Sequence, residues 1–224
     1  MIMKIKHLFS LLFILTFIFF IKCNKKESDE LTDWRKISNS NQWTDYNYFV
    51  QNYPESKKIE TAIHNSISLF KINNGFCGRF NLKFSSYSKD SLLCDGYIIP
   101  YDSIKIKTTN YLINSVYVGY FNKIKIPNTK KEALISKGLF DIELPKNGIN
   151  QNFKKALIEI TKGIYDYKKY LAKKWFKKSF DNLTSLETNF INDNVYNRLI
   201  FFEYTPYNPT PLEPTEKDTI INEL

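Results

Sequence analysis

Histidine and arginine are scarce in this chain of 224 residues, and their scarcity argues against several kinds of functional site. The two histidines, His7 and His64, are too few for a histidine metal centre. The three arginines, Arg35, Arg79 and Arg198, form no cluster of the kind that binds nucleic acid. No nucleophile elbow, phosphate-binding loop or zincin helix occurs either. The sequence therefore predicts no metal, no cofactor and no nucleic-acid partner.

One pair of carboxylates is spaced for joint acid–base work. Asp141 and Glu143 lie two residues apart on a predicted strand and therefore share one of its faces. No candidate base accompanies them, so they fit better the solvated side of a strand whose other face carries Leu139, Phe140 or Ile142. We accordingly expect a protein that is not an enzyme, with a hydrolase of unrecognised site as an alternative.

The amino terminus contains the longest apolar run of the chain. Lys4 and Lys6 precede the run, which extends over 14 residues from Leu8 to Ile21. A helix needs about 20 apolar residues to cross a bilayer, whereas the apolar part of an export signal is roughly 7–15 residues long. The length therefore favours residues 1–22 as a cleaved signal peptide.

The residues after this run resemble a bacterial lipoprotein signal, which makes Cys23 the predicted lipid attachment point. Lys22 stands where that family has a small residue, so an uncleaved anchor is the alternative. Residues 23–33 are then a predicted tether. Its acidic residues resemble surface-export signals of Bacteroidetes lipoproteins; these are Glu27, Asp29 and Glu30. We expect a membrane-anchored envelope protein facing the periplasm or the cell surface, with the outer membrane slightly favoured.

The two other cysteines, Cys77 and Cys94, form an even pair that flanks a predicted strand pair. In an oxidising compartment they can form a disulfide. Their spacing is equally compatible with two half-buried thiols.

The charge balance is basic and rests on lysine. Removal of residues 1–22 lowers the formal net charge from +9 to +6. A basic exported protein suits anionic lipids or wall polymers. A lysine-rich composition without any partner is the alternative.

The first folded segment is a predicted helical hairpin over residues 34–74, because apolar residues recur there at three- and four-residue spacing. Residues 46–62 resemble part of a tetratricopeptide-like hairpin. A single such unit is too short to be stable alone, so we expect it to pack on another part of the chain.

The rest of the chain predicts a small sheet with helices on one face, in the order strand, strand, helix, strand, helix, strand. Strands are expected at 80–85, 92–99, 138–144 and 199–202, and 101–121 fits either a strand or a helix. Asp95-Gly96 marks a bulge or a tight turn inside the second strand. The clearest helix starts near Phe153, with Asn150 or Asn152 as its N-cap. The fold class is therefore α+β. Residues 204–224 form a predicted proline-rich tail.

The long helix is strongly basic, with nine lysines between Lys154 and Lys178 against Glu159 and Asp166. Five of the lysines lie off its apolar stripe: Lys154, Lys155, Lys162, Lys169 and Lys173. Such a face can bind an anionic polymer or can simply be solvated.

A family resemblance is carried by the element order over residues 79–203, by residues 90–99 and 137–144, and by 170–176 followed by 180–183. In these features the chain resembles the periplasmic domain of the ExbD/TolR family, the accessory subunits of proton-driven envelope motors. The resemblance implies this fold, an envelope-binding role and homodimerisation. The apolar run lacks the membrane aspartate with which that family exchanges protons.

The predicted function is that of a non-enzymatic, membrane-tethered lipoprotein that binds an envelope protein or peptidoglycan. An ExbD-like subunit of a proton-driven transport complex, held by an uncleaved anchor, is one alternative. An envelope hydrolase is the other.

Overall fold

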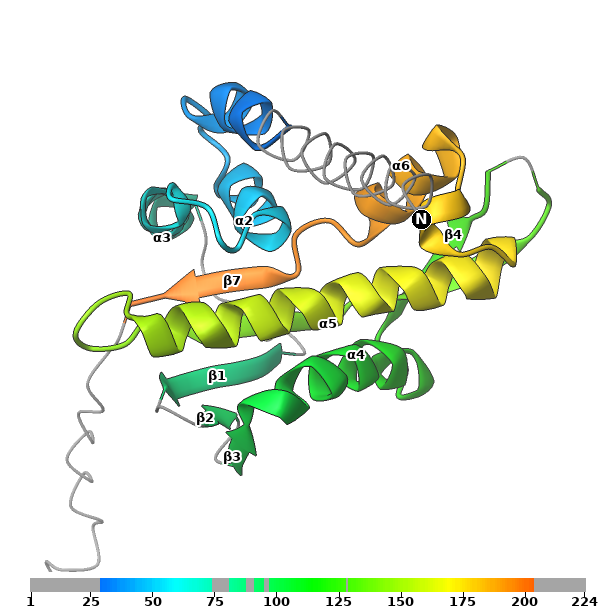
Figure 1. The fold of residues 1–224 in the computed structure, drawn as a ribbon. Helices are drawn as coiled ribbons and strands as arrows, with labels where there is room; N and C mark the ends of the chain where they lie inside the picture. Colours follow the sequence, from blue (N-terminus) through cyan, green and yellow to red (C-terminus); the bar gives the residue numbers. More distant parts are fainter. Residues whose placement is uncertain (1–28, 74–80, 88–90, 95–96, 128, 204–224) are drawn as a thin grey trace, which may run out of the picture.

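The computed structural model describes residues 29–73, 81–87, 91–94, 97–127 and 129–203 (Figure 1). The signal peptide, Cys23, Cys77 and the proline-rich tail lie outside these residues. Within them the protein is α+β: a helical region precedes a five-stranded mixed sheet, two long helices and a small second sheet. The predicted fold class is confirmed.

The amino-terminal region is helical, as predicted, and has three helices within the described residues. They are the helix over 29–37, α2 (Trp43–Asn52) and α3 (Ile59–Asn73). The predicted tether was too long, because residues 29–33 are already helical. Two side-chain hydrogen bonds hold this first helix against the hairpin: Ser56 donates to Glu30 at 2.6 Å, and Tyr53 donates to Asp33 at 2.8 Å.

The main sheet has the strand order β3-β2-β1-β6-β7. Its strands are β1 (Asn81–Tyr87), β2 (Ser91–Cys94), β3 (Tyr97–Pro100), β6 (Leu139–Glu143) and β7 (Leu199–Phe202). The prediction of one strand over 92–99, with a bulge or tight turn inside it, was wrong in counting a single strand. Two antiparallel strands occur there, with Leu93 opposite Ile98. The sequence Asp95-Gly96 stands between them, and an Asp-Gly pair favours a tight hairpin turn over a continuing strand.

The ambiguous segment after β3 is a helix, α4 (Tyr101–Tyr117). Ile104, Thr108 and Leu112 are fully buried on one side of it. Ile106, which would share a face with Ile104 in a strand, is 59% exposed. Pro100 precedes the first turn as the N-cap, a position that needs no helical hydrogen bond from its nitrogen.

Two features were not predicted. A two-stranded antiparallel sheet, β4 (Phe121–Lys125) and β5 (Glu132–Ser136), stands between α4 and β6. After α5 (Gln151–Phe176), a short 3-10 helix η1 (Phe180–Asn182) and α6 (Ser185–Asn194) lead into β7. A capping box in which Thr184 and Glu187 bond each other's backbone starts α6. This pair is a sequence signature that could have located the helix.

The two long helices cover one face of the sheet (Figure 1). Five buried residues lie on this face: Phe84, Phe140, Ile142, Leu199 and Phe201. Tyr111 of α4 packs on Phe140, with ring centroids 5.3 Å apart. The opposite face at β7 meets the hairpin instead, because Phe70 of α3 lies 5.8 Å from Phe202.

The hairpin also covers the open edge of β7. The side-chain amide of Asn47 in α2 donates to the carbonyl of Leu199, and the hydroxyl of Ser66 in α3 donates to Asn47. One turn later, the Gln51 amide donates to Val195 and accepts from the backbone nitrogen of Arg198. An uncovered strand edge can pair with other chains, and these amides prevent that pairing at β7.

The N-cap of α5 is Asn150, whose side chain accepts from the backbone nitrogen of Phe153 at 2.9 Å. We expect Asn150→Ala to lower the free energy of unfolding by about 1 kcal/mol, because that nitrogen loses its partner. Asn152→Ala is the matched control, since the side chain of Asn152 takes no part in the cap. Urea unfolding of both variants measures the difference. An equal loss in both would contradict the assignment of the cap.

Candidate functional site

The residues singled out from the sequence do not form one site. Cys94 is buried in β2, and its predicted pairing with Cys77 stays a prediction because Cys77 is not among the described residues. His64 is exposed on α3. In the described part of the chain, no group of three or more histidine, cysteine or acidic residues could hold a metal ion.

Asp141 and Glu143 lie on the face of β6 opposite Phe140 and Ile142, as predicted. Both are half-buried rather than fully solvated, and each has an interaction partner. The prediction that Leu139 lies on the other face was wrong. Residues two apart on a strand share a face, so Leu139 lies on the side of Asp141 and Glu143, and that face is not wholly polar.

The first half of the predicted basic face on α5 is largely neutralised by acidic neighbours. Lys154 reaches Glu60 of α3, with Nζ 2.8 Å from the carboxylate. Lys162 pairs with Glu159 one turn back at 2.6 Å. Only Lys155 differs, because its ammonium lies over the ring of Tyr101, 4.3 Å from the centroid.

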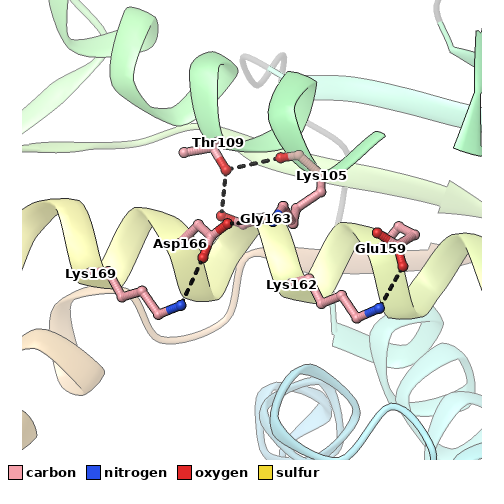
Figure 2. A network of polar contacts seen from close by, with 7 residues as sticks. All are labelled: Lys105, Thr109, Glu159, Lys162, Gly163, Asp166 and Lys169. Carbon is pink, nitrogen blue, oxygen red and sulfur yellow. Dashed lines mark hydrogen bonds and ion pairs between the residues drawn. The ribbon is translucent and has the colours of Figure 1, made fainter. Parts of the chain in front are cut away.

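The middle of the helix is neutralised by a network that also joins α4 to α5 (Figure 2). The carboxylate of Asp166 forms two ion pairs. The ammonium of Lys169 lies 3.1 Å from one of its oxygens, and the ammonium of Lys105 in α4 lies 3.2 Å from the other. Burial opposes ionisation of Asp166, but the hydrogen bonds from Lys169 and Lys105 outweigh it and lower the pKa of the carboxyl. Lys169 is therefore already paired with an acidic group.

The last two turns of α5 are different, and lysines from two parts of the chain gather around them. We call this cluster the basic end. It comprises six exposed lysines that line two adjoining cavities: Lys131, Lys169, Lys173, Lys174, Lys177 and Lys178. The end of α5 and the β4–β5 sheet lie on the same side of the molecule in Figure 1.

The two cavities meet at Lys177. One, of about 390 Å³, is lined by Lys173 and Lys177 together with Ser179 and Phe180. The other, of about 370 Å³, lies between α5 and β5 and brings Lys177 close to Lys131. Lys177 adopts a left-handed backbone conformation with φ of 59°, which ends the helix and turns the chain away from it.

Most of the charge at the basic end is uncompensated. Lys178 pairs with Glu187 at 2.9 Å, and Lys169 with Asp166. Across the described residues, no carboxylate lies within 4 Å of the four remaining ammonium groups, which belong to Lys131, Lys173, Lys174 and Lys177. Part of this charge offsets the negative end of the helix dipole. The dipole amounts to about half a charge, so a strongly positive surface remains.

Sequence reasoning missed the contribution of Lys131, because the β4–β5 sheet was not predicted. It also missed Lys168, the one lysine of α5 that is buried. Lys168 is four residues after Ile164 and three before Leu171, so its place on the apolar stripe was visible in the spacing.

Comparison with protein-family models, curated proteins and solved structures gives no match. The helices of the described ranges are all too short or too polar to span a bilayer.

Proposed function

We propose that this protein is an exported, lipid-anchored binding protein that holds an anionic cell-wall polymer at its basic end. The observation that carries the proposal is the convergence of six exposed lysines around two cavities, with four of them lacking an acidic neighbour among the described residues. Peptidoglycan, whose peptides bear carboxylates, is the polymer that suits this charge and an envelope location.

The signal-like amino terminus supports the same proposal, because it would place the basic end outside the cytoplasm. The resemblance to the ExbD/TolR family adds wall or partner binding and homodimerisation as further parts of the proposal. An acidic envelope protein is the alternative occupant of the basic end. Both kinds of partner would be held by screened electrostatic attraction, so binding should weaken as salt rises.

Sedimentation with purified peptidoglycan tests the proposal on the full-length protein in detergent. The test variant combines Lys173→Gln, Lys174→Gln and Lys177→Gln. The matched control combines Lys154→Gln, Lys155→Gln and Lys162→Gln, which removes the same charge from the same helix. Each lysine near an anionic surface contributes about 1 kcal/mol, so we expect the test variant to bind more than tenfold more weakly. The control should bind nearly as wild type.

Two results would overturn the proposal: no sedimentation of the wild type at low salt, or an equal loss in the control variant. The intact mass of the same preparation checks the anchor, with a diacylglyceryl group on Cys23 expected. A chain that keeps residues 1–22 would instead support the uncleaved anchor.

A further inference from the structure

A second, separate feature of the molecule is a cleft of about 360 Å³ between the end of α2 and the middle of α5. Its lining has six polar or charged residues and four apolar ones. The former are Gln51, Asn52, Glu55, Thr161, Lys162 and Lys168, and the latter are Pro54, Ile158, Ile164 and Tyr165. Clefts of roughly 300 Å³ and more, apolar with a few polar groups, are typical of small-molecule sites.

Lys168 is the unusual member of this lining. Its side chain is only 4% exposed, and its ammonium donates to the side-chain oxygen of Asn192 in α6 at 3.0 Å. An ammonium has three donors, and Asn192 is neutral. Among the residues that the structure describes, no carboxylate lies within 4 Å of Lys168. The charge is therefore buried without a counter-ion.

Such an arrangement is costly unless an anion completes it. Burial lowers the pKa of Lys168 to about 8, which reflects the poor solvation of its charged form. Two other charged residues, Glu55 and Lys162, line the cleft. Lys162 is itself a cation and pairs with Glu159, and within the described residues Glu55 makes no ion pair with Lys168. A bound anion would supply both the missing charge and acceptors for the unused ammonium donors.

We propose that this cleft binds the carboxylate of a small organic acid, with Lys168 as the residue that contacts it. One buried ammonium balances a singly charged carboxylate better than a doubly charged phosphate. Ile158 and the ring of Tyr165 offer a surface for a short apolar group next to that carboxylate. The end of a peptide, with its terminal carboxylate and small side chains, has this chemistry. The proposal does not depend on the basic end.

Calorimetric titration of the full-length protein in detergent tests the site. The probes are N-acetyl-alanyl-alanine, the same dipeptide with an amidated end, and inorganic phosphate. We expect the wild type to bind the acid and to bind the amide at least tenfold more weakly. Lys168→Met should weaken binding of the acid at least tenfold. Lys155→Met is the matched control, because it removes an exposed lysine of the same helix that lines neither the cleft nor the basic end, and should change the affinity less than twofold.

Three outcomes would overturn the proposal. They are equal binding of acid and amide, unchanged binding of the acid by Lys168→Met, and the absence of binding by the wild type. Tighter binding of phosphate than of the acid would refute the carboxylate assignment. Lys168→Gln serves as a second variant, because it keeps a polar side chain of similar length while removing the charge. Since peptidoglycan sedimentation depends on other lysines, each proposal can fail without the other.

Discussion

Gly163→Ala is expected to lower the free energy of unfolding by about 2 kcal/mol, although alanine is the better helix former by about 1 kcal/mol. Gly163 lies where α5 crosses α4. A Cβ atom there would come 2.5 Å from Cβ of Thr108 and 2.7 Å from the carbonyl oxygen of Lys105. Neither atom belongs to a flexible side-chain end, so the helices would have to separate.

The same separation would disturb the polar contacts between the two helices (Figure 2). The hydroxyl of Thr109 donates to the carbonyl oxygens of Lys105 at 2.9 Å and Gly163 at 3.0 Å. Urea unfolding measures the effect, with Lys173→Ala as an exposed control on α5 that should change stability by less than about 0.5 kcal/mol. If Gly163→Ala proved more stable than the wild type, the close approach of α4 and α5 would be refuted.

Lys168→Met is expected to have the opposite sign and to raise the free energy of unfolding at pH 7 by about 1–3 kcal/mol. The variant removes a buried charge that has only a neutral partner, and methionine fills a similar volume within the apolar stripe of α5. A residue that reduces stability while lining a cleft fits a binding role better than a structural one.

The pH dependence of this gain identifies its cause. The pKa of Lys168 is about 8 in the folded protein, below its ordinary value of 10.5. Between these two values the unfolded chain binds more protons than the folded one, so the wild type gains stability as pH rises. The advantage of Lys168→Met should therefore be largest below pH 8 and should shrink by about pH 10. Urea unfolding of both proteins at pH 7 and pH 9.5 measures it. A pH-independent difference would mean that packing, not charge, is responsible.

The secondary structure could be predicted wherever one periodicity dominated. The apolar stripe that begins at Phe153 predicted α5 with little ambiguity, because its three- and four-residue spacing repeats over about seven helical turns. Residues 101–117 were ambiguous, since Ile104 and Ile106 fit a strand while Ile104, Thr108 and Leu112 fit a helix. The packing of α4 against α5 favours the helix over the strand. This packing involves residues far apart in the sequence, so the local pattern does not predict it.

The candidate sites were less predictable than the fold. Lysines and acids of α5 could be counted from the sequence, but their pairing depends on distant segments. Glu60 of α3 neutralises Lys154, and Lys105 of α4 competes for Asp166. Lys131 precedes β5 and lines the same cavity as Lys174 and Lys177 at the end of α5. The β4–β5 sheet that positions it was not predicted from the sequence. The helix α5 could therefore be predicted from its local sequence, whereas the net charge on its surface depends on the tertiary structure.

The amino-acid sequence by itself determined the α+β class, the helical hairpin, the strands β1, β6 and β7, and the basic long helix α5. These follow from local periodicity and from residues whose backbone preferences are strong. Only the tertiary structure decided which lysines stay uncompensated at the basic end and that Lys168 is buried beside a cleft. The reason is physical: net charge and solvation at a point depend on every group within a few ångströms, and most of those groups come from other parts of the chain.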